Sequence, residues 1–336
     1  MLPEQLSSNL CSLHPGVDKL TYSMVWQFRK LKNHKYDVEN PIYFNFSPGI
    51  IHSKARLSYE EADSIIEQNS SMTHLDNRWV TPEIESAVRS MNDLSRQIGS
   101  LRNPFDLDLE FSNQYKLDEN NKIQIADTGT TASHKLIENL MILANNYAAK
   151  NLKDKDIIRT HTGLKGNNES FLKFLCTVYR LDTGRISGLY RSGKYRSVIE
   201  AFLQKINEDD KNIDFLRVHF GSMLSSAYYD KKDGMNPEAQ KHIGVDLDQY
   251  THFTSPIRRY ADILVHLALK DKRIANFNSV DNDRVFLAKR LERLYKKIFA
   301  LLYLVQEYPE GFRDEVLKII KRLRVSSKRL YLQLGT

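Results

Sequence analysis

The sequence has few cysteines and no long hydrophobic run, and both absences exclude classes of protein. Its 336 residues contain two cysteines, Cys11 and Cys176, which argues against a disulfide framework or a cysteine-based zinc site and favours a reducing compartment. The longest apolar run, residues 298–305, is far shorter than the roughly 20 residues that span a bilayer. The first residues, MLPEQLSSNL, lack the features of a secretory signal. We therefore expect a cytoplasmic or nuclear protein that has no membrane partner.

Common motifs for nucleotides and metals are also missing. No GxxxxGK[ST], GxGxxG or HExxH segment occurs, so the sequence supports neither a phosphate-binding loop nor a dinucleotide or zinc site. Carboxylate oxygens suit Mg²⁺, but paired aspartates are also typical of solvated strands and turns. We therefore predict no metal site at Asp106 and Asp108, Asp246 and Asp248, or Asp281 and Asp283. Packing or capping best explains His161, His242, His252 and His266.

Positive charge is concentrated near the C-terminus. The net charge of the chain is +7, whereas residues 284–336 alone hold 13 lysines and arginines against 5 acidic residues. Nucleic acid is a plausible partner for such a segment, although the charged faces of surface helices give the same count.

Hydrophobic patterns predict an α+β fold in which strands come early and helices dominate later. Ser58 and Glu61 form a capping box that opens a helix. Gly99 is predicted to end the helix that begins near Thr81. The predicted strands are 19–28, 41–47 and 105–111, the last paired with 122–126, and the other predicted helices are 133–152, 168–181, 197–206 and most of the chain after 281. The aromatic and basic residues of 188–197 suit base stacking or, more commonly, a core.

Two adjacent arginines follow a Ser-Pro-Ile in the segment THFTSPIRRYADILVH. Pro256 suits the first position of a helix, which would place Arg258 and Arg259 in its first turn. Cations are unfavourable there because the helix N-terminus is already positive, and a bound phosphate would resolve the conflict. The alternative is a surface turn in which Arg258 pairs with Asp262.

Five segments resemble, in order, the landmarks of one enzyme family. They are MLPEQLSSNLCSLHPGVDKLTYSM, IIHSKARLSYEEA, SHKLIENLMILANNYAAK, IIRTH and YTHFTSPIRRYADILVH. They are similar to the catalytic (RNB) domain of the ribonuclease II and ribonuclease R family of 3′-to-5′ exoribonucleases, which includes the exosome catalytic subunit. The resemblance runs from Met1 to about Lys297.

The resemblance implies roles for individual residues. It places the family's phosphate-contacting catalytic arginine at Arg258, with Arg259 beside it on the RNA backbone. Tyr59 and Glu138 match residues that contact nucleotides at the 3′ end and help to distinguish ribose from deoxyribose, since a carboxylate accepts a hydrogen bond from the 2′-hydroxyl group. Glu292 matches a glutamate near the same site.

The sequence also departs from the family pattern. The aspartates that bind Mg²⁺ in the family precede the MLPE landmark, and no such cluster is found in these residues. Asn139 and Leu267 stand where the family has Glu and Arg. The resemblance therefore implies Mg²⁺ as the family cofactor, while we expect this chain alone to hold none and to lack hydrolytic activity.

These expectations define one hypothesis and two alternatives. Residues 1–283 are predicted to form an RNB-type domain that lacks its N-terminal segment, and residues 284–336 a basic helical segment. The chain would bind single-stranded RNA and act in RNA decay or processing. Its expected partners are an upstream segment or a second chain that completes the domain, and an RNA-decay complex. The alternatives are a catalytically inactive RNA-binding regulator and a helical interaction module without an RNA role.

Overall fold

A computed structural model describes most of the chain. The described residues are 2–32, 35–67, 80–102, 114–118, 122–126, 130–154, 156–161, 169–192, 194–204 and 225–270, with single positions at 287, 291, 294, 298, 299, 302, 303, 306 and 318. The chain forms two compact units: Met1–Leu107 with Thr130–Phe277, and Asp108–Gly129 with Asn278–Thr336. The predicted boundary after residue 283 stays a prediction.

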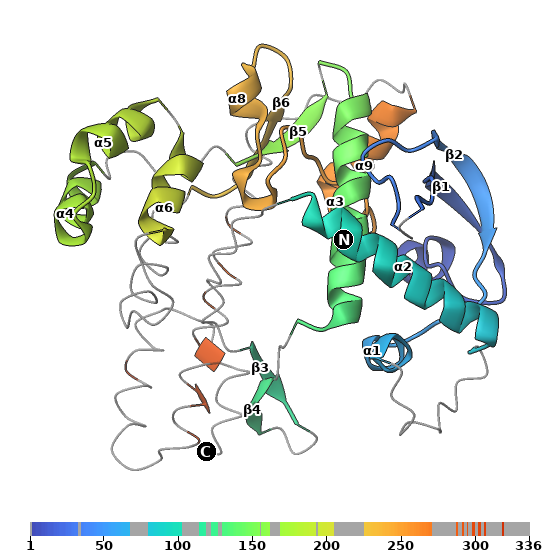
Figure 1. The fold of residues 1–336 in the computed structure, drawn as a ribbon. Helices are drawn as coiled ribbons and strands as arrows, with labels where there is room; N and C mark the ends of the chain where they lie inside the picture. The colour runs from blue at the N-terminus through green and yellow to red at the C-terminus, as the bar shows by residue number, and fades with distance from the viewer. Residues whose placement is uncertain are drawn as a thin grey trace. The chain divides into compact units, whose positions relative to one another are not determined.

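The first unit contains both helices and strands, as the α+β prediction requires (Figure 1). It begins with a short π-helical segment, Gln5–Leu10. Its strands are β1 (Asp18–Gln27), β2 (Tyr43–His52), β5 (Ile157–Thr160) and β6 (Tyr228–Lys231). Its helices are α1 (Tyr59–Glu67), α2 (Pro82–Ser100), α3 (Ala132–Asn151), α4 (Glu169–Tyr179), α5 (Thr183–Arg191), α6 (Tyr195–Leu203), α8 (Pro237–Gln240) and α9 (Tyr260–Leu269).

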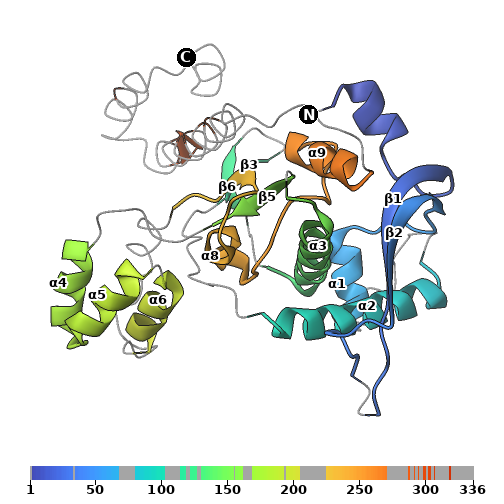
Figure 2. The ribbon, with the colours of Figure 1, turned by 90° about the horizontal axis from the view of Figure 1, so that it is seen from above.

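The long helix α3 organises this unit. Figure 2 shows α3 with the β1–β2 hairpin on one side and β5 on the other. The hairpin packs on α3 through aromatic rings, since Tyr147 lies 4.6 Å from Phe44 and 5.6 Å from Trp26 between ring centroids. Both strands were expected from their aromatic and β-branched residues, and β1 pairs with β2 in antiparallel register. α2 also packs against α3.

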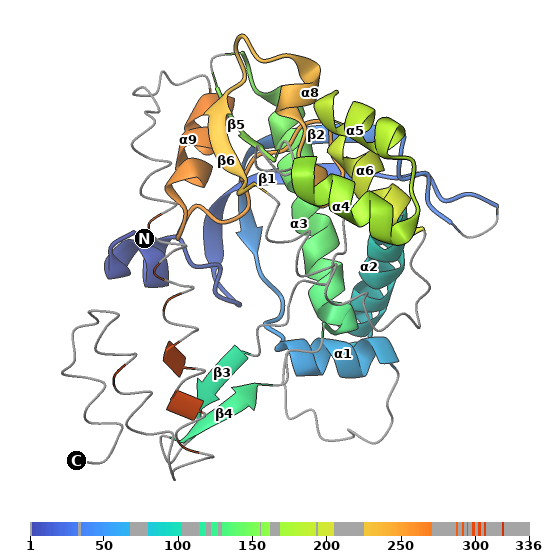
Figure 3. The ribbon, with the colours of Figure 1, turned by 90° about the vertical axis from the view of Figure 1, so that its left-hand side faces the viewer.

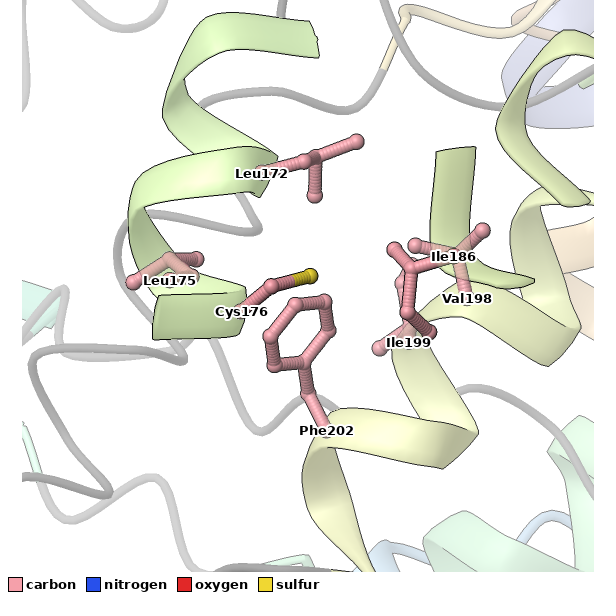
Figure 4. Packing of buried hydrophobic residues seen from close by; sticks show 7 residues of the cluster. All are labelled: Leu172, Leu175, Cys176, Ile186, Val198, Ile199 and Phe202. Carbon is pink, nitrogen blue, oxygen red and sulfur yellow. The ribbon is translucent and has the colours of Figure 1, made fainter. Parts of the chain in front are cut away.

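Helices α4, α5 and α6 form a group with its own core (Figure 3). Figure 4 shows that core, which is made of Leu172, Leu175, Cys176, Ile186, Val198, Ile199 and Phe202. Tyr190 and Tyr195 pack against it and meet edge to face at 5.5 Å. Two aromatic residues of segment 188–197 thus serve packing, and burial of Cys176 raises the pKa of its thiol.

The second unit contains a hairpin of β3 (Gln114–Leu117) and β4 (Ile123–Ala126). The strand predicted at 122–126 is confirmed, and its partner in this hairpin is β3, which the sequence patterns did not predict. The strand predicted at 105–111 lies outside the described residues. The Gln306 side chain bonds both backbone groups of Ile123, at 2.9 and 3.0 Å. All nine positions described beyond residue 286 are helical.

One predicted helix start agrees with the structure, and one predicted helix end does not. The Ser58–Glu61 capping box is confirmed: the Ser58 amide donates to Glu61 Oε2 at 2.6 Å, and the Glu61 amide to Ser58 Oγ at 3.2 Å. Helix α2 ends at Ser100, so its predicted end is off by one residue, and Gly99 lies in the last turn rather than capping the helix. Within the described part of the chain, no helix is long and apolar enough to cross a membrane.

Candidate RNA-binding site

The two adjacent arginines precede helix α9 rather than opening it. The amides of Arg258 and Arg259 both donate to the Ser255 carbonyl, at 3.3 and 3.1 Å, which closes a turn. Arg259 is then extended, with φ −124° and ψ 122°, and α9 begins at Tyr260. The prediction of a helix from Pro256 is therefore wrong. A proline fits the start of a turn as well as that of a helix, so its presence did not decide between them.

Arg259 holds a buried carboxylate. Its Nε and Nη2 atoms donate to Asp262 at 2.7 and 2.9 Å, and the Ser255 amide donates to the same carboxylate at 2.7 Å. The Asp262 side chain is fully buried, whereas that of Arg259 is 24% exposed. The expected alternative pairing of Asp262 with Arg258 is wrong, because Arg259 takes that place. The RNA contact predicted for Arg259 stays a prediction.

Arg258 is exposed next to this ion pair. Among the residues that the structure describes, no carboxylate lies within ion-pair distance of its guanidinium group. Its charge is thus available to an anion, and the phosphate contact predicted for Arg258 stays a prediction.

Two asparagines of α3 anchor the chain that leads to Arg258. Asn145 donates to the Tyr250 hydroxyl and accepts from the Phe253 amide, both at 2.8 Å. Asn146 donates to the Gln249 carbonyl at 2.7 Å. These bonds are buried or partly buried, so they fix the segment before Arg258 on the C-terminal half of α3.

Tyr59 lies against the N-terminal half of the same helix. Its ring stacks on His134, with ring centroids 3.9 Å apart and planes inclined by 12°. His134 Nδ1 is held by Thr131 Oγ1 at 2.8 Å, and both rings are exposed, Tyr59 by 45%. The pair therefore presents aromatic surface to solvent at the start of α3.

Asp63 on α1 provides the cap for α3. It accepts a 2.8 Å hydrogen bond from the Ser133 amide in the first turn, where the preceding Thr131 makes no side-chain cap. Burial acts to raise the pKa of Asp63, but hydrogen bonds from Thr131 and Ser133 outweigh it, so the pKa is lowered overall. This contact positions Tyr59, the first residue of α1, beside α3.

Glu138 lies one helical turn after His134. Its side chain is 45% exposed and accepts a 3.0 Å bond from Lys135 Nζ. A surface pair of this kind is weak, so the carboxylate can accept a hydrogen bond from a ligand. Tyr59 thus stacks on His134, and Glu138 follows His134 by one turn of the same helix. Asn145 follows Glu138 by seven residues, about 10 Å along the helix axis.

The residue after Glu138 shows why this chain departs from the family pattern. Asn139 donates to the Ser95 carbonyl at 3.1 Å and accepts from Arg102 Nη2 at 2.5 Å. A glutamate there could not donate to the carbonyl. A Cβ atom on Gly99 would come within 2.7 Å of Asn139 Nδ2, so this close approach of α2 and α3 explains the glycine.

Sequence patterns did not identify Arg102, although it lies beside the site. Burial lowers the pKa of its guanidinium, while the charge of Glu138 and, more weakly, Tyr250 and Asp246 act in the opposite direction. Its position depends on how α2 meets α3, and no short motif records that packing.

The predicted packing roles of two histidines are confirmed. His266 stacks on the Phe253 ring, with centroids 4.3 Å apart, and bonds the Phe253 carbonyl at 2.8 Å. His252 Nδ1 lies 2.5 Å from the Tyr229 hydroxyl.

The described carboxylates do not form a Mg²⁺ site. Asp246 occupies a left-handed turn position with φ 55°, and Asp248 is 89% exposed and lies 3.9 Å from Lys241. Within the described ranges, no group of three or more His, Cys, Asp or Glu side chains could hold a metal ion. The candidates Glu292, Asp106, Asp108, Asp281 and Asp283 lie outside the described residues.

Comparisons with known proteins identify the family of this chain. The family model for the RNB domain matches residues 1–272. Ribonuclease R of Chlamydia trachomatis serovar D is 32% identical over 277 residues, which are 80% of this chain and 35% of that protein. The Mus musculus exosome complex exonuclease RRP44 is 27% identical over 287 residues, which are 80% of this chain and 26% of that protein.

A solved structure shows the same fold. Mycoplasma genitalium RNase R in complex with ribose-methylated single-stranded RNA matches with a TM-score of 0.65 at 22% identity, over 91% of this chain and 48% of that one. The chain thus spans about a third of the first curated relative and about half of this structure. On the family match over residues 1–272, the chain belongs to the RNB domain family.

Proposed function

We propose that this chain binds the 3′-terminal part of single-stranded RNA along helix α3. The observation that carries the proposal is the stack of the exposed Tyr59 and His134 rings at the start of α3, one helical turn before the partly exposed Glu138. Aromatic rings stack on bases of any sequence, and a carboxylate accepts a hydrogen bond from the 2′-hydroxyl group. The fold neighbour that was solved with single-stranded RNA supports this class of ligand.

In this proposal Arg258 contacts the RNA backbone. The arginine is exposed, and the segment before it is fixed on α3 by Asn145 and Asn146. A guanidinium group binds phosphate oxygens through paired N–H donors, so a positioned arginine gives a directed contact. The Arg259–Asp262 ion pair makes the turn rigid and thereby positions Arg258.

We further propose that hydrolysis requires aspartates outside these 336 residues. When bound, Mg²⁺ would supply an activated water molecule and stabilise the charge that develops on the phosphate group. The carboxylates that the structure describes do not fit such a site, so we derive no hydrolytic step from them. In the RNB family, the corresponding aspartates lie before the MLPE landmark. A polypeptide that supplies them would complete a 3′-to-5′ exoribonuclease of RNA decay or processing, in the cytoplasm or the nucleus.

The β1–β2 hairpin offers a place for that polypeptide. Leu20 and Ile50 are cross-strand partners, yet they are 78% and 68% exposed. An exposed apolar pair of this kind favours a covering segment. Coexpression with the family's aspartate segment should therefore raise the soluble yield, and Leu20→Asp should remove the gain. An equal yield with and without the segment would contradict this part of the proposal.

The experiment that tests RNA binding is fluorescence anisotropy with labelled oligoadenylate at several salt concentrations. Four to six phosphate contacts predict a slope of roughly −3 to −4 for log K against log salt. Arg258→Ala should weaken binding and make the slope less steep by about 0.7. Affinity that does not change with salt would overturn the proposal.

A further inference from the structure

Arg102 is a partly buried cation that forms no ion pair with the residues that the structure describes. It follows the end of α2, and its Nη2 atom donates to the neutral amide oxygen of Asn139 at 2.5 Å. Its Nε atom is buried and has no hydrogen-bond partner. Among the described residues, no carboxylate lies within 4.0 Å of its guanidinium group. A buried charge without such a partner is unfavourable, so this environment favours an additional anion.

The described residues around Arg102 do not supply that anion. Glu138 and, more weakly, Asp246 attract it electrostatically, but neither forms an ion pair with it, and the Glu138 carboxylate accepts a hydrogen bond from Lys135. The Tyr250 hydroxyl is bonded to Asn145. A guanidinium group carries five N–H donors, and the only side-chain partner of Arg102 among the described residues is the Asn139 amide oxygen.

We propose that Arg102 binds an RNA phosphate next to the ribose that Glu138 contacts. This inference rests on the proposed function. In RNA, the 2′-hydroxyl group and the 3′-phosphate are attached to neighbouring carbons of one ribose. A protein that binds both groups therefore needs a hydrogen-bond acceptor for the hydroxyl group and a cation for the phosphate at neighbouring positions. Glu138 and Asn139 are consecutive on α3, and Asn139 holds the Arg102 side chain beside them.

The other reading of Arg102 is structural, because it also links the end of α2 to α3 through Asn139. If the role of Arg102 is structural, replacing it should lower the stability of the fold and weaken the binding of all ligands equally. A phosphate contact predicts an effect that depends on the charge of one particular phosphate. The test must therefore change the ligand as well as the protein.

The experiment uses the full chain and labelled oligoadenylates in which one phosphate at a time is replaced by an uncharged methylphosphonate. Arg102→Gln should weaken binding of unmodified RNA roughly 10- to 100-fold, as expected for a hydrogen bond to a charged group. It should also reduce the salt slope by about 0.7. Arg96→Gln is the matched control, because Arg96 is exposed on α2, the helix that precedes Arg102, and its loss removes the same charge.

At one position near the 3′ end, the methylphosphonate should weaken binding by the wild type and not by Arg102→Gln. Equal sensitivity of both proteins at every position would overturn the inference, as would equal effects of the Arg102 and Arg96 substitutions. If Arg102→Gln does not fold, Arg102→Lys keeps the charge without the planar fork, and it should bind more weakly while keeping the salt slope. A wild type that binds no RNA would overturn the proposed function, whereas RNA binding that is indifferent to Arg102 overturns only this inference.

Discussion

Replacing Glu138 by alanine should weaken RNA binding and leave DNA binding almost unchanged. A hydrogen bond to a charged group contributes about 1.5 to 3 kcal/mol, which corresponds to a roughly 10- to 150-fold loss of affinity. Competition from the Lys135–Glu138 ion pair reduces this binding contribution only slightly, because an exposed ion pair contributes about 1 kcal/mol or less. DNA has no 2′-hydroxyl group, and it should bind slightly better once a negative charge is removed. Anisotropy titrations with matched RNA and DNA oligonucleotides measure both affinities.

Glu85 offers the matched control for this substitution. It lies on α2, is 37% exposed and pairs with Arg89 at 2.9 Å, so Glu85→Ala removes a similar surface ion pair. The ratio of RNA to DNA affinity should fall in Glu138→Ala and stay constant in Glu85→Ala. An equal loss for RNA and DNA in Glu138→Ala would refute the reasoning and indicate that Glu138 only supports the helix.

The remaining predictions concern stability and activity. Arg259→Ala should lower the free energy of unfolding by about 3–5 kcal/mol, because it leaves the buried Asp262 unpaired, and Arg258→Ala by under about 0.5 kcal/mol, both measured by urea unfolding. Burial holds the pKa of folded His266 below its ordinary value of 6.5. The unfolded chain therefore binds more protons at this site than the folded chain does. The free energy of unfolding should fall as the pH drops below about 6.5, and it should fall less in His266→Gln. With Mg²⁺, the purified chain should release no more nucleoside 5′-monophosphate from RNA than an identically prepared Arg258→Ala sample.

Local sequence signals predicted those parts of the fold that local interactions determine. The Ser58–Glu61 capping box and the periodicity of α3 involve residues one or two turns apart, so the sequence contains the whole signal. The start of α9 was predicted wrongly, because the turn at Pro256 is completed by the buried pair of Arg259 and Asp262. Nothing in that short segment indicates that Asp262 is buried.

The candidate site came from the family resemblance rather than from residue chemistry. Exposed residues such as Tyr59 and Glu138 are not part of a periodic hydrophobic pattern. Only the resemblance of their segments to family motifs identified them. Arg102 had neither signal. Its importance follows from the close packing of Gly99 on Asn139, which brings the end of α2 against α3. Such packing joins segments about 40 residues apart and becomes visible only in three dimensions.

Photochemical crosslinking tests the proposed position of the RNA most directly. An oligonucleotide with 4-thiouridine at its 3′ end would be bound to the full chain and irradiated, and the crosslinked peptides would be identified by mass spectrometry. Our account predicts crosslinks in peptides from α1 and the N-terminal half of α3, which contain Tyr59, His134 and Glu138. Crosslinks confined to the basic segment 284–336 would contradict it, because RNA would then be held by the charge of that segment alone.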